Sequence, residues 1–131
     1  MSYNRDMDKI TILENLLRKA DATWARLQAL YPTLREHKTP EVILNNRLYR
    51  TAGRAFQEDC VVELASKFLL HSQEFHDTMY HVILPHELAH VADFLVFGES
   101  EKKCGHGQKW RDIMLQLGLE PDPFHTMDLT Q

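Results

Sequence analysis

The chain has 131 residues, of which 44% are apolar and 26% are charged. These values predict one globular domain over residues 1–131, with frayed ends at about residues 1–6 and 127–131. Fifteen basic and nineteen acidic residues give a formal net charge of −4, so overall charge does not favour a polyanion binder. Any contact with nucleic acid must therefore be local.

Cysteine content and hydropathy predict the compartment. Cys60 and Cys104 are too few and too far apart for a disulfide framework, and the N-terminal residues do not resemble a signal peptide. Charged residues interrupt every apolar run before it reaches the length of a membrane span. We therefore expect a cytoplasmic protein that makes no membrane contact.

The first predicted element is an amphipathic helix from about Ile10 to Tyr31. Its apolar residues recur every three or four positions, which is the period of one helical face: Ile10, Leu13, Leu17, Ala20, Trp24, Leu27 and Tyr31. Such a stripe more often packs on the core of its own domain than on a partner. The helix should end at Tyr31, because a residue before proline is pushed out of helical geometry.

Three short segments rich in β-branched and aromatic residues follow, at Val42–Leu44, 48–56 and Cys60–Leu64. Polar turns separate them, so we predict a small, mainly antiparallel three-stranded sheet. An exposed sheet edge can bind an extended peptide through backbone hydrogen bonds. The alternative is that this sheet only supports the helices.

Three arginines, Arg47, Arg50 and Arg54, fall within eight residues of one another in this region. One interpretation is a basic patch that contacts substrate or nucleic acid. The other is that these side chains are solvated or paired with some of the nineteen acids.

Residues that typically begin and end helices flank the apolar stretch that follows the third segment. Ser72 and Asp77 are candidate N-terminal caps, and Gly98 is a natural stop after Phe97. Pro85 removes a backbone donor, so either a helix begins near it or a longer helix kinks there.

The residues that carry chemistry lie in this stretch, in the sequence His86-Glu87-Leu88-Ala89-His90. Residues four apart share a helical face, so both imidazoles can bind one metal ion while Glu87 reaches its open side. Neutral imidazole suits zinc, and a catalytic zinc site combines three protein ligands with a water whose acidity the ion raises. The pattern fixes only three of five positions, so ordinary helix histidines beside a surface acid are the alternative.

We predict His106 as the third ligand. Gly105 and Gly107 allow close backbone approach, and apolar residues at helical spacing predict a helix directly afterwards. The segment after His90 is long enough to fold back over the metal helix. A lone histidine in a loop is usually just exposed, so this assignment depends on its surroundings.

Two rivals for the third position stay open. Asp93 lies one turn beyond His90 on the same stripe, where a hydrogen bond to an imidazole is easier than ligation. Cys104 is chemically a good zinc ligand, but it is more often a plain free thiol.

Together these motifs closely resemble the SprT-like zincin family, which includes the protease domain of Spartan. The resemblance rests on the run from Val82 to His90, the phenylalanine-glycine stop, and Gly105-His106-Gly107-Gln108-Lys109-Trp110. It also includes Ala52-Gly53 and covers roughly residues 10–128. It implies an α+β zincin-like fold with an N-terminal helix, a small sheet, a metal helix and a C-terminal helix.

The resemblance implies a zinc metalloendopeptidase with one zinc ion on His86, His90 and His106, and with Glu87 as the catalytic acid/base. It also implies a role for His125, which resembles a histidine that follows the last helix in this family. That side chain would stabilise the oxyanion or contact substrate. The alternative is an ordinary tail histidine.

The resemblance leaves the role of DNA open. Spartan degrades proteins crosslinked to DNA, which implies a protease that acts on DNA-associated proteins, near the nucleoid. The 131 residues contain neither the cysteine-pair zinc ribbon of many bacterial relatives nor the DNA-binding modules of the eukaryotic ones. The competing interpretation is a non-catalytic zinc-containing module that binds protein or DNA.

A cluster of basic residues surrounds His106 and predicts weak, salt-sensitive DNA binding. Its members are Lys102, Lys103, Lys109 and Arg111, with the single acid Asp112 close behind. The alternative is that these side chains are merely solvated.

Overall fold

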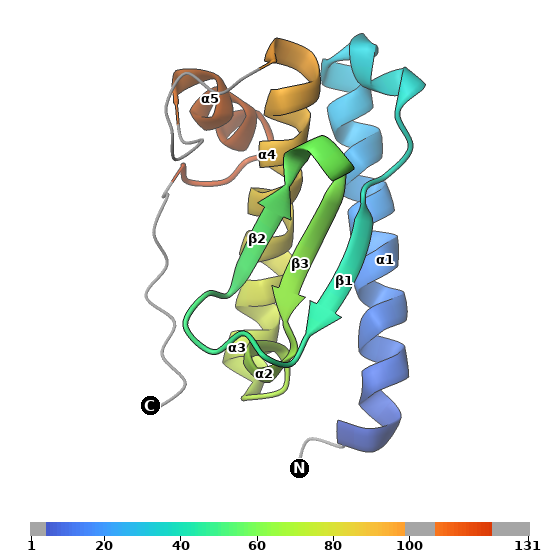
Figure 1. Ribbon diagram of the computed structural model, residues 1–131, viewed down its shortest axis with the longest axis vertical. Coiled ribbons are helices and arrows are strands. Elements are labelled where there is room, and N and C mark those ends of the chain that lie inside the picture. Colours follow the sequence, from blue (N-terminus) through green and yellow to red (C-terminus); the bar gives the residue numbers. More distant parts are fainter. Residues whose placement is uncertain (1–4, 99–106, 122–131) are drawn as a thin grey trace.

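The computed structural model describes residues 5–98 and 107–121, with side chains from residue 9 onward. Figure 1 shows an α+β arrangement in which a small sheet lies in front of the long helices. Within the described ranges, no helix is long and apolar enough to cross a membrane. The elements in chain order are α1 (Arg5–Leu30), η1 (Pro32–Glu36), β1 (Glu41–Asn45), β2 (Gly53–Phe56), η2 (Gln57–Asp59), β3 (Val61–Ala65), α2 (Ser66–Leu69), α3 (Gln73–Thr78), η3 (Met79–Ile83), α4 (Leu84–Phe97) and α5 (Gln108–Gln116).

The sheet is mixed, with strand order β1-β3-β2. β3 runs parallel to β1, with Val62 opposite Val42, and antiparallel to β2, with Glu63 opposite Arg54. The prediction of a mainly antiparallel sheet therefore holds for only one of the two pairings. The chain does reverse at each connection, but β3 inserts between the first two strands and so runs in the same direction as β1.

The predicted second strand is too long. β2 occupies only Gly53–Phe56, and residues 46–52 form turns and bends between β1 and β2. The polar Asn45 side chain begins this connection, because its Oδ1 accepts a hydrogen bond from the Arg47 backbone N–H at 2.8 Å. Such a side-chain bond offers the backbone an alternative to the sheet ladder.

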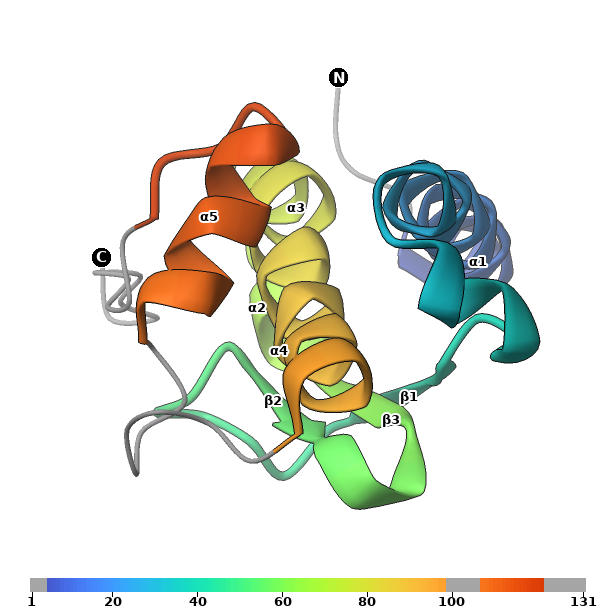
Figure 2. The same ribbon diagram turned by 90° about the horizontal axis from the view of Figure 1, so that it is seen from above.

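The helices form a layer on one face of the sheet. Figure 2 shows α4 in the middle of this layer, with α1 on one side and α5 on the other. α4 also packs against β2 and β3. Strand residues alternate between faces, so Val62 and Leu64 are buried while Arg54 and Glu63 lie on the opposite face.

α1 is the predicted amphipathic helix, and it ends before Pro32 as expected. Arg5 and Asp6, which were expected to be frayed, belong to the helix. The buried stripe differs from the predicted one in the first half of α1, where Ile12 and Leu16 are buried while Ile10 and Leu17 are exposed. Apolar residues occur on two neighbouring faces there, so spacing alone selected the wrong one.

The metal helix is the last part of an uninterrupted helical run. α3, the π-helical turn η3 and α4 follow one another directly, and the Leu84 N–H donates to the carbonyl of Met79, five residues back. Pro85 thus lies in the first turn of α4, directly after the π-helical turn, where the hydrogen-bond register of the run changes. The sequence predicted either a helix start near Pro85 or a kink in a longer helix. The structure has a longer helical run whose hydrogen-bond register changes at the π turn.

The predicted caps are confirmed in two of three cases. Ser72 Oγ accepts a hydrogen bond from the Phe75 N–H at 3.1 Å, and Gly98 ends α4 with a φ of 82°. Asp77 is not a cap, because it lies inside α3 and accepts a hydrogen bond from Gln73 Nε2 at 2.8 Å.

Candidate metal centre

The central position of α4 buries the polar side chains of the motif. Every residue from Leu84 to Asp93 is buried, because the sheet, α1 and α5 together surround this part of the helix. His86 is 4% exposed, and Glu87 and His90 are each 6% exposed. Buried polar groups need partners, so the contacts among these three side chains decide what the cluster can do.

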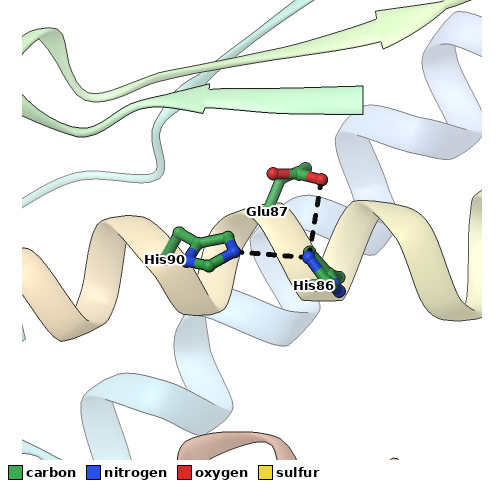
Figure 3. A group of neighbouring side chains, drawn as sticks. All are labelled: His86, Glu87 and His90. Carbon is green, nitrogen blue, oxygen red and sulfur yellow. Dashed lines mark hydrogen bonds and ion pairs between the residues drawn. The ribbon is translucent and has the colours of Figure 1, made fainter. Parts of the chain in front are cut away.

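The three side chains converge on one point beside α4, as Figure 3 shows. The Nε2 atoms of His86 and His90 are 3.3 Å apart, and Glu87 Oε2 is 3.9 Å from His86 Nε2. The potential ligand atoms of the three residues all lie within 4.8 Å of one another. Two facing imidazole nitrogens beside a carboxylate are a donor set that suits zinc and similar divalent ions.

Glu87 lies between α4 and the sheet. Burial raises the pKa of its carboxyl from 4.5 to about 8. Across from it, Gly53 opens β2, and a Cβ atom at this position would lie 3.2 Å from Glu87 Cγ and 3.0 Å from Ile83 Cγ2. The absence of a side chain at Gly53 therefore lets the strand backbone lie directly against the carboxylate residue.

Sequence reasoning missed the role of Trp110 in this site. Its fully buried indole reaches α4 from α5 and contacts both histidine rings. The ring centroids of Trp110 and His90 are 5.1 Å apart and nearly parallel, at 12°, whereas the His86 ring lies 4.8 Å away at 67°. In the sequence, Trp110 is the last residue of the motif that begins at Gly105, and its position also fits an ordinary core residue.

Several predicted site residues lie outside the described part of the chain. They are His106, the proposed third ligand, its rival Cys104, the basic residues Lys102 and Lys103, and His125. The other rival, Asp93, is buried one turn beyond His90, and the group of converging ligand atoms does not include it.

The three arginines lie in β2 and in the connection that precedes it. Arg54 Nε donates to Glu63 Oε1 at 2.6 Å, and the guanidinium lies over the Phe56 ring. Gly53 faces α4, and neighbouring strand residues point to opposite faces of the sheet. The Arg54 side chain therefore lies on the face away from α4. Arg50 lies over the Tyr49 ring, and Arg47 belongs to the turn after β1.

The described basic residues of α5 also contact the protein itself. Lys109 Nζ lies 4.7 Å from the centroid of the Phe97 ring, and an Arg111 guanidinium nitrogen lies 3.5 Å from the Pro121 carbonyl oxygen.

The fold and the cluster define a class: an α+β protein whose long helix carries a potential metal site of the HExxH type. Residues 13–127 match the SprT-like family, so the chain belongs to that family. The expectation based on the motifs is thereby confirmed.

Two relatives carry the name Protein SprT. The one from Glaesserella parasuis serovar 5 (strain SH0165) is 28% identical over 96 residues, which are 72% of this chain and 58% of that protein. The one from Shewanella oneidensis (strain MR-1) is 36% identical over 47 residues, 35% of this chain and 28% of that protein. The chain thus spans less than two thirds of either relative. No solved structure matches it.

Proposed function

We propose that this protein is a zinc-dependent metalloendopeptidase. The observation that carries the proposal is the convergence of two imidazole nitrogens, 3.3 Å apart, with a buried carboxylate beside them on a single helix. Membership of the SprT-like family supports the same assignment. A closed structural zinc site is less suitable, because such sites use four ligands and seldom place an acid beside the metal.

His86 and His90 would hold the ion, with His106 as the third ligand. Zinc, when bound, would acidify a water molecule and polarise the carbonyl of a substrate. A ligand from a separate segment can approach from across the site and leave one position open. For that reason we prefer His106 to Asp93, which follows His90 on the same helix.

Glu87 would transfer the proton during peptide hydrolysis. In its ionised form it takes a proton from the attacking water, and it then donates that proton to the nitrogen of the leaving amine. A metal ion held by the histidines would favour the ionised form, against the burial that raises the pKa of this carboxyl. The close approach of Gly53 limits how far the Glu87 side chain can move away.

The sheet would bind the substrate backbone through β2. β2 is an edge strand, and among the described residues β3 is the only strand that pairs with it. Its first residue contacts Glu87, so a peptide added along the free edge would pass close to the carboxylate. Backbone hydrogen bonds of this kind bind a segment without selecting its sequence.

Glu87→Gln tests the catalytic role. The amide keeps the size of the side chain and leaves the three proposed ligands intact, but it cannot accept the proton, so we expect zinc to stay while hydrolysis of an unfolded protein substrate collapses. Glu14→Gln is a matched control, because it makes the same change at an exposed position of α1. Equal hydrolysis by Glu87→Gln and the parent protein would exclude Glu87 as the base.

The same assay distinguishes the enzyme from a binding module of the same fold. A binding module would retain zinc in the parent protein and in Glu87→Gln, and neither protein would hydrolyse the substrate. An enzyme would show zinc-dependent cleavage in the parent and in Glu14→Gln only.

A further inference from the structure

We propose that Trp110 is a positioning residue for the metal centre. Its indole holds the imidazole rings of His86 and His90 in the orientation that ligation requires. The inference rests on the proposed zinc site. It adds a residue from α5 that does not itself ligate, and it predicts that metal affinity depends on that residue.

The indole of Trp110 packs against both histidine rings. The face of the indole covers the face of the His90 ring at 5.1 Å and 12°, and the His86 ring meets the same indole at 4.8 Å and 67°. An imidazole turns about its outer side-chain torsion, and a large ring packed against it blocks that rotation. One fully buried side chain therefore restricts both rings at once.

Trp110 also contacts the backbone of α4. The indole N–H of Trp110 donates to the carbonyl oxygen of His86 at 3.4 Å, a long bond that joins α5 to the first ligand residue. Ring contact and N–H together fix the indole relative to α4. The apolar indole covers one side of the two imidazole rings. Their Nε2 atoms face each other.

Restricting the two rings changes the free energy of metal binding. A ligand side chain that is already held in its bound orientation loses less conformational freedom when the ion binds, so the affinity is higher. Partners that orient ligating histidines typically change metal affinity by about 10- to 100-fold when they are removed. We expect the indole to act within this range.

Trp24 provides a matched control. It is the only other tryptophan, is 1% exposed, and donates its indole N–H to the His37 carbonyl oxygen at 2.8 Å. Trp24 lies in α1, and among the described residues the rings of His86 and His90 contact each other and Trp110 rather than Trp24. Substitutions at Trp24 and Trp110 therefore remove similar buried groups, but only one of them contacts the histidines.

The experiment compares Trp110→Phe and Trp110→Leu with Trp24→Phe and Trp24→Leu. Zinc affinity is measured at one pH by competition with a chelator, and thermal stability is measured without metal. We expect all four variants to lose stability. The zinc affinity should fall at least about tenfold in Trp110→Leu, less in Trp110→Phe, which keeps an aromatic face, and less than about twofold in either Trp24 variant.

A spectroscopic measurement keeps the inference testable if Trp110→Leu does not fold. In Trp24→Phe, Trp110 is the sole tryptophan, and Co²⁺ bound at the histidines should quench its fluorescence strongly. In Trp110→Phe, the fluorescence of Trp24 should change little.

Two results overturn the inference alone: zinc affinities in the Trp110 variants equal to those of the Trp24 variants, or Co²⁺ that binds without quenching Trp110. If the parent protein binds neither Zn²⁺ nor Co²⁺, the proposed metal centre fails and the inference fails with it. The parent measurement therefore separates the two failures.

Discussion

At the scale of single residues, the burial of Glu87 has a consequence for stability. In the metal-free protein its carboxyl has a pKa of about 8, against 4.5 for an ordinary glutamate, because burial disfavours the charged form. Between these values the folded state keeps a proton that the unfolded state releases. The contribution of Glu87 to the free energy of unfolding therefore falls as pH rises from about 5 to 8.

We accordingly expect Glu87→Gln to stabilise the metal-free protein more at pH 8 than at pH 5. Each pKa unit corresponds to about 1.4 kcal/mol, so the two pH values should differ by a few kcal/mol. Urea unfolding of both proteins in the presence of a chelator measures this. Stability curves that stay parallel over this range would contradict the assignment of a neutral buried carboxyl.

Single substitutions also test which residue is the third zinc ligand. We expect His106→Ala to lower zinc affinity by several orders of magnitude and to abolish hydrolysis, because a ligand is lost. Asp93→Asn should weaken binding far less, as for a group that supports a ligand, and Cys104→Ser should do little. Chelator competition on all three variants at one pH ranks them, and the reverse order for His106 and Asp93 would overturn the assignment.

At the scale of elements, the contact between β2 and α4 determines where Glu87 lies. In Gly53→Ala the new Cβ would approach the Glu63 carbonyl oxygen at 3.2 Å, which is backbone, as well as the Glu87 side chain. We expect a loss of about 1–3 kcal/mol in stability, and a larger relative loss of hydrolysis because Glu87 is displaced.

Gly118→Ala is the control for this variant. Gly118 has a φ of 80°, and a Cβ atom added there would meet nothing within 4 Å, so alanine strains the backbone without a steric contact. It should cost about 1 kcal/mol and leave hydrolysis unchanged. If both glycine variants retain full activity, the β2 contact does not position Glu87.

The elements also show what the sequence could predict. Strong local signals were sufficient for α1 and its end at Tyr31-Pro32, for the Ser72 cap, for the stop at Gly98 and for the metal-binding pattern itself. The insertion of β3 between β1 and β2 depends on pairing between distant segments, which local periodicity does not specify. The buried face in the first half of α1 likewise depends on what packs against it.

The site was predictable to the extent that its residues are neighbours in the sequence. His86, Glu87 and His90 share one helix, so their spacing alone predicted the cluster. Trp110 and Gly53 reach the cluster from other elements, and their contacts arise only from tertiary packing. Both residues belong to the motifs that resemble the family, but those motifs do not specify which side chains these residues contact.

At the scale of the whole molecule, the net charge of −4 limits nucleic-acid binding to local contacts. We propose that the basic cluster around α5 binds DNA weakly, because a few phosphate contacts give an affinity that falls steeply with salt. Fluorescence anisotropy with a labelled duplex at about 50 and 200 mM salt measures this. A double variant, Lys109→Gln with Arg111→Gln, should bind more weakly and with a smaller salt dependence.

Lys67→Gln is the control for the DNA measurement. Lys67 lies on α2, at the opposite end of the molecule from α5 in Figure 1. Its substitution should therefore leave DNA binding unchanged. Binding that is absent even at low salt, or that does not depend on salt, would rule out this electrostatic contact.

We propose that the chain holds one zinc ion on the histidines of α4. The most direct test is metal analysis after loading at neutral pH, on the parent protein and on the double variant His86→Ala with His90→Ala. We predict about one zinc per chain in the parent, released by a chelator or by acidification because imidazole must be neutral to ligate, and almost none in the variant. A parent protein without zinc, or a double variant that binds as much as the parent, would contradict the account.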